Sequence, residues 1–416
     1  MKVLKFGGTS VGSAQRMKEV AKLITDGERK IVVLSAMSGT TNTLVEISDY
    51  LYKKNPEGAN EIINKLESKY RQHIDELFAT PEYKQKGLEL IKSHFDYIRS
   101  YTKDLFTLFE EKVVLAQGEL ISTAMMNYYL QECGVKSVLL PALEYMRTDK
   151  NAEPDPVYIK DKLQVQLELH PDAEIYITQG YICRNAYGEI DNLQRGGSDY
   201  TASLIGAAIN ASEIQIWTDI DGMHNNDPRI VDKTAPVRHL HFEEAAELAY
   251  FGAKILHPTC IQPAKYANIP VRLLNTMDPT APGTLISNDT EKGEIKAVAA
   301  KDNITAIKIK SIDMICTSEV GVSVSIDNVK HLNEILDDLK KYGTVTVDKD
   351  MCIICVVGDL EWENVGFEAK ALDAMRDIPV RMISFGGSNY NISFLIRECD
   401  KKAALQSLSD ALFNEE

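Results

Sequence analysis

The sequence has few features that would place it outside the ordinary globular proteins. It contains 7 cysteines among 416 residues, and an odd number at wide spacings suits reduced thiols better than a disulfide framework. Its longest apolar runs, such as IVVLSAM and MCIICVVG, fall well short of the roughly 18 residues that a membrane-spanning helix needs. The N-terminus, MKVLKFGG, reaches two glycines before a signal-peptide apolar region develops. We therefore expect a cytoplasmic protein with no membrane partner.

The chain also lacks an excess of positive charge and a recognisable metal site. Lys and Arg number 46 against 61 Asp and Glu, a net charge of -15, which disfavours a nucleic-acid partner. Cys352 and Cys355 form a C-x-x-C spacing, but they lie in an apolar run that predicts a buried strand, where residues three apart face opposite sides. His239 and His241 are better explained by local packing. We predict no structural metal site.

Three nucleotide-binding signatures are missing as well. There is no G-x-x-x-x-G-K-[ST] run, no G-x-G-x-x-G after a strand, and no HRD or DFG pair. P-loop, Rossmann and protein-kinase chemistry are therefore unsupported. Any phosphate chemistry here belongs to another fold.

The pattern along the chain predicts two regions of different architecture. Short β-branched runs alternate with helical patterns, which is typical of a parallel α/β sheet. Between about Pro56 and Glu110, apolar residues repeat at helical spacing, so we expect an all-helical insertion there. A turn-rich loop at Met277 to Thr284 ends the first region. The strands beyond it come in adjacent pairs, as in α+β ferredoxin-like modules.

Three strand-to-helix transitions carry Gly, Ser and Thr, at Lys5 to Ser13, Leu34 to Asn42 and Gln194 to Ser203. Glycines let a backbone approach a ligand, while hydroxyls and helix N-terminal amides donate to an anion. A tight turn would explain the first segment as well as an anion site would. An ordinary loop with a helix cap would explain the second. In the third, QRGGSDYTAS, capping by Asp199 accounts for neither Arg195 nor the double glycine.

Five motifs in order along the chain resemble those of the aspartokinases, which have the amino-acid kinase fold: KFGGTS, QGELIS, RGGSDYTA, WTDIDGMHNNDPR and FGAKILHP. The paired C-terminal modules resemble the ACT domains of that family. The resemblance implies a mostly parallel sheet between helices in residues 1–290, with the helical insertion at about 56–110. It implies two ACT modules, in residues 291–350 and 351–416.

The resemblance also implies a site. Lys5 and Lys254 would face the phosphates of ATP, and Asp199 would organise the site near them. The acceptor L-aspartate would be bound by Ser35, Thr41, Glu119, Arg195 and Ser198. The nucleotide would be contacted by Lys5, Gly7, Gly8, Thr9, Ser10, Thr218, Asp219, His224, Asp227, Arg229 and Lys254. Mg²⁺ would arrive with the nucleotide and use few protein ligands.

Two of the implied site residues, Glu119 and His224, differ from what the local sequence or the family pattern would suggest. Glu119 lies in VVLAQGELIST, where we predict a strand-to-helix transition, and a carboxylate there is otherwise an exposed first-turn residue. His224 stands where the family usually has Tyr, so an imidazole would replace an aromatic contact to the nucleotide.

In the aspartokinases, paired ACT modules bind lysine or threonine and assemble the subunits. We therefore expect one of these effectors and at least a homodimer through the ACT region. The first module is short: only residues 311–313 separate two strands that a helix should connect. Either the protein has lost about twenty residues or the given sequence omits them. Two rival functions remain, another amino-acid kinase such as glutamate 5-kinase and a catalytically silent amino-acid sensor.

Overall fold

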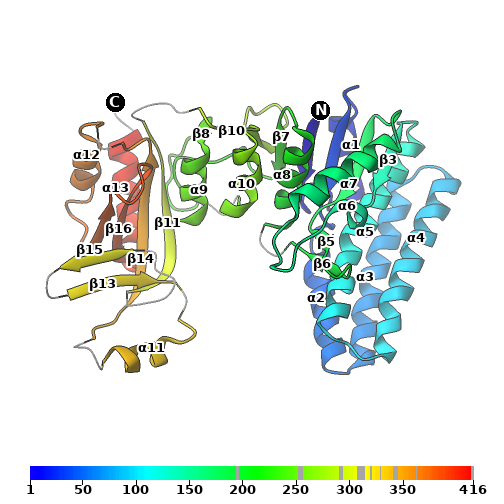
Figure 1. Ribbon diagram of the computed structural model, residues 1–416, viewed down its shortest axis with the longest axis horizontal. Helices are drawn as coiled ribbons and strands as arrows, with labels where there is room; N and C mark the ends of the chain where they lie inside the picture. The colour runs from blue at the N-terminus through cyan, green and yellow to red at the C-terminus, as the bar shows by residue number, and fades with distance from the viewer. Residues whose placement is uncertain are drawn as a thin grey trace. The chain divides into compact units, whose positions relative to one another are not determined.

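The computed structural model describes residues 1–193, 196–251, 256–289, 294–306, 314–318, 321–327, 329–340, 345–361 and 363–413. These form two compact units that are interleaved along the chain (Figure 1). Unit 1 comprises residues 1–221 and 259–285, and unit 2 comprises residues 222–258 and 286–416.

Unit 1 is built on a sheet with the strand order β3-β4-β2-β1-β7-β9-β10. Strand β1 pairs in parallel with β2 and β7, β4 with β2 and β3, and β7 with β9. The strands are β1 (Lys2–Phe6), β2 (Lys30–Leu34), β3 (Ser137–Leu140), β4 (Ile175–Gln179), β7 (Ile214–Thr218), β9 (Val271–Asn275) and β10 (Thr284–Ser287). Every residue of β2 and β4 is buried, which is typical of parallel strands covered on both faces. The predicted parallel α/β architecture is confirmed.

The helices of unit 1 surround this sheet, some packed against its strands and others against helices. They are α1 (Ala14–Ile24), α2 (Thr40–Tyr52), α3 (Pro56–Leu77), α4 (Pro81–Ser100), α5 (Leu108–Glu132), α6 (Ala142–Tyr145), α7 (Pro156–Glu168), α8 (Gly197–Ile209) and α10 (Pro258–Tyr266). A short hairpin, β5 (Ile182–Arg184) with β6 (Ile190–Asn192), follows β4.

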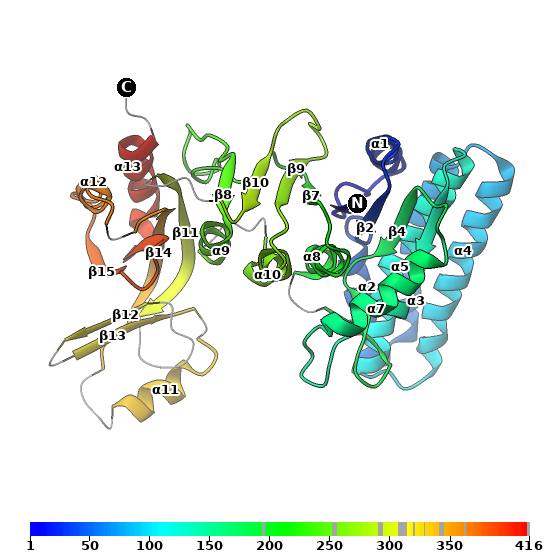
Figure 2. The same cartoon turned by 45° about the horizontal axis from the view of Figure 1, so that its top comes forward.

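The predicted helical insertion is present as α3, α4 and the short 3₁₀ helix η1 (Tyr101–Lys103). Helices α3, α4 and α5 lie side by side in both views (Figures 1 and 2). Asn55 and Thr80 cap the first two of these helices, and each is followed by a proline in the first turn. This arrangement is a strong local start signal for a helix, because the proline needs no amide donor there.

The prediction of a strand-to-helix transition at Glu119 is wrong. Glu119 lies in the middle of α5, a helix of 25 residues that begins at a capping box formed by Thr107 and Glu110. Almost every residue of α5 from Val114 to Asn127 is buried. A helix that is buried on all sides has no solvent-facing polar stripe and so shows no 3.6-residue period. The run VVL in its first half, with two β-branched valines, therefore imitates a strand.

Unit 2 contains an antiparallel sheet with the order β12-β13-β11-β14-β16-β15. Its strands are β11 (Ile295–Ala306), β12 (Ile315–Ser318), β13 (Gly321–Ile326), β14 (Asp348–Gly358), β15 (Val380–Phe385) and β16 (Asn391–Arg397). Its other elements are β8 (His239–His241), α9 (Phe242–Tyr250), α11 (Leu332–Leu339), α12 (Phe367–Ala374), η2 (Glu398–Asp400) and α13 (Lys401–Phe413). Helix α13 packs on β11 and β14 (Figure 2). The predicted α+β region is confirmed.

Strand β14 holds the C-x-x-C pair as the sequence predicts. Cys352 belongs to the apolar cluster with α12 and α13, whereas Cys355, of opposite parity in the strand, lies outside that cluster. Burial raises the pKa of both thiols, which disfavours the thiolate form that binds metals. None of the helices in the described part of the chain is both long and apolar enough to cross a membrane.

The segment from Gly222 to Val237 is part of unit 2 although it precedes the strands of the antiparallel sheet in the sequence. Asn225 accepts a hydrogen bond at its carbonyl from Val298 N of β11 (2.9 Å). Asn226 Nδ2 donates to Leu405 O of α13 (3.1 Å). Val231 is fully buried in the apolar cluster beneath α13. This segment therefore completes the packing of unit 2.

The absence of a helix near residues 311–313 is a prediction that falls outside the described residues. Strand β11 ends at Ala306 and β12 begins at Ile315.

Candidate active site

The predicted site residues of unit 1 gather at one edge of its sheet. Strands β1, β2, β4 and β7 are mutually parallel, so their carboxyl ends meet at the same edge. Gly7 to Ser10 follow β1, Ser35 follows β2, and α8 begins beyond β4 with Gly197. Ligands in open α/β sheets bind outside the carboxyl ends of the strands. Motifs far apart in the sequence are thus brought together where a ligand is expected.

Lys5 and Asp199 form an ion pair at this edge. Lys5 Nζ lies 2.7 Å from Asp199 Oδ1, and the two side chains are only 12% and 18% exposed. Lys5 is near the end of β1, and Asp199 lies in the first turn of α8, where the helix dipole favours a carboxylate. A β-carbon on Gly7 would stand 3.5 Å from the ammonium group of Lys5. The cation is therefore held against the glycine-rich backbone.

The loop after β1 is shaped by close backbone contacts. Gly7 N donates to Trp217 O (3.3 Å), and Gly8 O accepts from Ser38 N (3.1 Å). A β-carbon on Gly8 would come within 2.8 Å of Ala36 O, so only glycine fits there. Ser10 is fully buried and its hydroxyl bonds Thr276 Oγ1 at 2.7 Å. The carbonyl of Thr9 accepts from Arg16 Nη1.

The loop after β2 meets the start of α8. Ser35 Oγ donates to Ser198 Oγ at 2.9 Å, although 163 residues separate them. Gly180, which follows β4, makes this meeting possible, because a β-carbon there would stand 2.3 Å from Ser198 Oγ. Thr41 is the second residue of α2 and is partly exposed. Two hydroxyls of the predicted acceptor site are thus in contact.

Glu119 presents a buried carboxylate to the same loop. Its side chain is 4% exposed, and Oε1 accepts from Ala36 N at 3.1 Å. Oε2 is buried and has no hydrogen-bond partner among the described residues. Burial raises the pKa of Glu119 to about 7, because desolvation disfavours the charged form. An unpaired buried carboxylate oxygen is well suited to receive a cationic group of a ligand.

The predicted nucleotide residues after β7 are divided between the two units. In unit 1, Thr218 O accepts from Thr276 N (2.8 Å), and Thr218 Oγ1 donates to Asp219 Oδ1 (3.2 Å). In unit 2, His224 Nδ1 lies 3.1 Å from Thr234 Oγ1. The imidazole is therefore anchored to a neighbouring loop.

Asp227 and Arg229 form a local pair in unit 2. The guanidinium donates to both carboxylate oxygens, at 2.9 and 2.7 Å. Hydrogen bonds from Arg229 hold the pKa of Asp227 below its ordinary value. The predicted residues Arg195 and Lys254 lie outside the described part of the chain.

Sequence reasoning missed several residues that shape the site. Gly180 and Thr276 have no role in the sequence-based interpretation, and Ser122 enters it only as the last residue of the QGELIS motif. Tyr181 adopts a left-handed backbone with φ of 69° and donates from its amide to Thr201 Oγ1 (3.0 Å). A non-glycine residue in this conformation often marks a functional site. The Gly-Tyr pair directly after a buried strand is the signal that could have pointed to this position.

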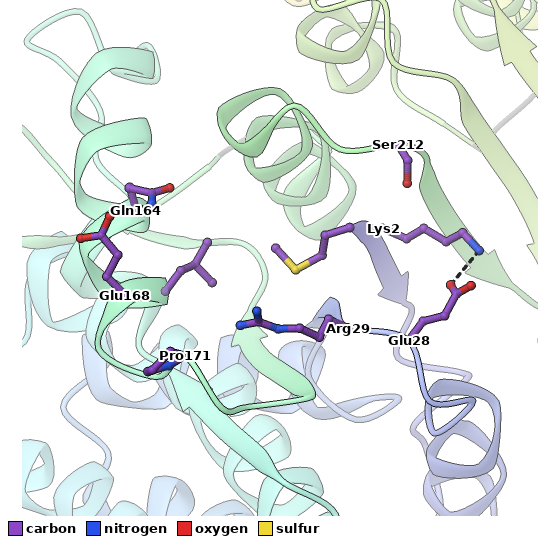
Figure 3. A pocket seen from close by; sticks show the side chains of 9 residues that line it. Lys2, Glu28, Arg29, Gln164, Glu168, Pro171 and Ser212 are labelled. Carbon is purple, nitrogen blue, oxygen red and sulfur yellow. Dashed lines mark hydrogen bonds and ion pairs between the residues drawn. The ribbon is translucent and has the colours of Figure 1, made fainter.

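A separate cavity of about 780 Å³ lies where the strands begin rather than where they end (Figure 3). Its lining includes Lys2 at the start of β1 and Arg29 just before β2. Lys2 is paired there with Glu28 at 3.0 Å. The lining contains none of the predicted site residues, so this cavity is distinct from the candidate active site.

Comparison with known proteins agrees with this geometry. Residues 1–275 match the amino acid kinase family, and residues 354–412 match an ACT domain. The chain is 33% identical to aspartokinase 1, chloroplastic, of Arabidopsis thaliana, over 99% of this chain and 80% of that protein. The fold and these matches define a kinase of the amino-acid kinase class.

Two solved structures show the same fold. The E. coli aspartokinase III complex with aspartate and ADP (R-state) matches with a TM-score of 0.83 and 29% identity, covering 99% of this chain and 100% of that one. The complex of that enzyme with lysine and aspartate (T-state) matches with a TM-score of 0.81 and 30% identity, covering 99% of each. The chain belongs to the aspartokinase family, and the predicted family and fold are confirmed.

Proposed function

We propose that this chain transfers the γ-phosphoryl group of ATP to the side-chain carboxylate of L-aspartate, giving 4-phospho-L-aspartate. The observation that carries the proposal is the buried Glu119 carboxylate, whose free oxygen suits the ammonium group of an amino acid. The aspartate and ADP bound to the E. coli relative support the same substrates. The reaction would open the route to lysine, threonine and methionine.

The acceptor would be held by charge and by hydroxyl donors. Glu119 would receive its ammonium group, and the adjoining Ser35 and Ser198 hydroxyls would donate to its carboxylates. By family resemblance, Thr41 would donate another hydrogen bond and Arg195 would bind the α-carboxylate. The reacting carboxylate has an ordinary pKa of about 4 and is ionised at neutral pH, so the reaction needs no general base.

The main barrier to the reaction is repulsion between two anions. Lys5, fixed by Asp199 at 2.7 Å, would place its positive charge beside the transferring phosphoryl group. Such a charge stabilises the transition state without moving during the reaction. Asp199 would act by holding Lys5 rather than as a base. Gly7, Gly8, Thr9 and Ser10 would border the phosphates, and Lys254 would contact them.

The remaining nucleotide contacts are proposed from the motif after β7. Thr218, Asp219, His224, Asp227 and Arg229 would bind ATP. Mg²⁺ would come with the nucleotide. Asp199 is a hard oxygen donor at this edge, and one such carboxylate suits a metal ion held mostly by phosphates and water. When bound, the ion would neutralise phosphate charge.

The C-terminal region would regulate the enzyme. The match to an ACT domain, and the lysine bound to the E. coli relative, support feedback by lysine or threonine. We propose ACT modules in residues 291–350 and 351–416 after a catalytic region in residues 1–290, and at least a homodimer through the ACT region.

The test is to measure ADP release from Mg-ATP with L-aspartate, with L-glutamate and with no acceptor, trapping any acyl phosphate with hydroxylamine. Wild type is compared with Lys5→Ala and with Lys2→Ala. Lys2 lies on the same strand but is paired with the exposed Glu28, so it is a matched control. We expect aspartate-dependent hydroxamate in wild type and Lys2→Ala, and a loss on the order of a hundredfold in Lys5→Ala.

Other outcomes identify the rivals. Turnover of glutamate alone would indicate the sister kinase. If neither acceptor gives an acyl phosphate, and lysine or threonine but not Mg-ATP raises the melting temperature, the chain is an amino-acid sensor.

A further inference from the structure

Helix α5 holds a single peptide unit of the acceptor loop at both of its polar atoms. Ser122 Oγ donates to Ser35 O at 2.8 Å, and Ala36 N donates to Glu119 Oε1 at 3.1 Å. The carbonyl of Ser35 and the amide of Ala36 belong to one planar peptide group. Glu119 and Ser122 are three residues apart and so share a face of the helix. Together they fix the rotation of that peptide.

The close approach of α5 to this loop is built into the helix. A β-carbon on Gly118 would stand 2.7 Å from Ala36 Cβ and 3.3 Å from Thr40 Cγ2. Gly118 therefore lets the helix axis come near the loop. The three residues Gly118, Glu119 and Ser122 of the QGELIS motif all serve this one contact.

The contact between α5 and the Ser35–Ala36 peptide is buried from solvent, so the loss of a hydrogen-bond donor there is costly. Ser122 is 0% exposed and Glu119 is 4% exposed. A buried carbonyl that loses its donor cannot turn to water instead. Ser122 Oγ also lies 3.2 Å from Glu119 O in its own helix, but its shorter contact is the one to Ser35 O.

The peptide connects two groups that would bind the acceptor. The side chain of Ser35 donates to Ser198, and the amide of Ala36 is the hydrogen-bond donor to Glu119. Rotation of the peptide would move the Ser35 hydroxyl and remove the donor from Glu119 together. We propose that Ser122 is a positioning residue for the acceptor amino acid, acting through the Ser35–Ala36 peptide without touching the substrate. This inference rests on the proposed function.

The inference predicts a selective kinetic effect. Replacing Ser122 by Ala should raise the KM for aspartate about tenfold, the size expected for one lost buried hydrogen bond. The KM for ATP should stay within about twofold, because the Lys5–Asp199 pair does not involve this peptide. Replacing a residue that only stabilised the fold would not raise the KM for aspartate more than the KM for ATP.

The experiment compares Ser122→Ala with Ser48→Ala in the full-length enzyme. Ser48 is also a buried helical serine, and its hydroxyl donates to Leu44 O in its own helix α2 (3.0 Å). Ser48→Ala should leave both KM values unchanged. A third variant, Ser122→Cys, keeps the side-chain size but offers a weak donor, so its KM for aspartate should be close to that of Ser122→Ala.

Three kinetic results would overturn the inference: an unchanged KM for aspartate in Ser122→Ala, an equal rise in both KM values, or full recovery in Ser122→Cys. The last would show that volume matters and the hydrogen bond does not. If wild type makes no hydroxamate from aspartate, the proposed function fails instead. Calorimetric titration with aspartate needs no turnover, so weaker binding by Ser122→Ala than by wild type would still support the inference, and equal binding would refute it.

Discussion

Replacing Glu119 by Gln should stabilise the ligand-free protein at high pH while destroying acceptor binding. The pKa of the Glu119 carboxyl group is an ordinary 4.5 in the unfolded chain and about 7 in the folded one. The folded protein therefore binds more protons between these values, and its stability falls as the pH rises from 4.5 through 7. The amide introduced by Glu119→Gln would carry no charge, would still accept from Ala36 N, and would escape this loss.

The magnitude follows from the same two values. At about 1.4 kcal/mol per pH unit, the difference between 4.5 and about 7 amounts to roughly 3 kcal/mol of destabilisation above about pH 8. In a unit of this size that corresponds to a melting temperature higher by about 6 °C or more in the variant. At about pH 4.5 the two proteins should melt alike. Thermal melts followed by circular dichroism across about pH 4.5 to 8.5 measure the difference directly.

The result that would refute this reasoning is a melting-temperature difference that does not change with pH. It would mean that the Glu119 carboxylate is not penalised by burial in the free enzyme. An independent check is the wild-type protein with saturating aspartate: the ammonium group should recover part of the lost stability at about pH 8, and the variant should show no such gain.

Two further substitutions test the contacts of the site. Gly180→Ala would place a β-carbon 2.3 Å from Ser198 Oγ and 2.9 Å from its Cα, so the start of α8 must shift and the KM for aspartate should rise by about tenfold or more. Gly387→Ala, with no atom within 4 Å of its β-carbon, is the control, and equal KM values in the two variants would contradict this account. His224→Tyr should alter the KM for ATP more than kcat; an unchanged KM would show that His224 does not touch the nucleotide.

The sequence predicted most of the fold because its elements carry strong local signals. Strands such as β2 carry a continuous apolar run, IVVL, and the insertion helices start at an Asn or Thr cap followed by proline. The prediction failed in α5 at Glu119, since a helix buried on all sides has no polar face to set its period. The burial of α5 comes from its tertiary environment, which local patterns do not encode.

The site was predicted from residue types, but its contacts were not. Glycines and hydroxyls beside Lys5 and Asp199 pointed to an anion site, and the family motifs assigned roles. The meeting of Ser35 with Ser198 across 163 residues, and the clearance provided by Gly180, depend on strand order. Only the folded sheet brings β2 and β4 together, so no sequence signal paired these residues with one another.

The interleaving of the two units sets a limit on how the protein can be dissected. A fragment starting at residue 286 would contain the whole antiparallel sheet of unit 2, yet it would lack Val231 beneath α13 and the carbonyl of Asn225 that receives Val298 N. Its apolar surface would be open to solvent, and such a surface promotes aggregation. Residues 222–258 belong to the same unit, so we expect a peptide of these residues added in trans to restore the missing contacts. Fragment complementation therefore suits this half of the protein better than simple truncation.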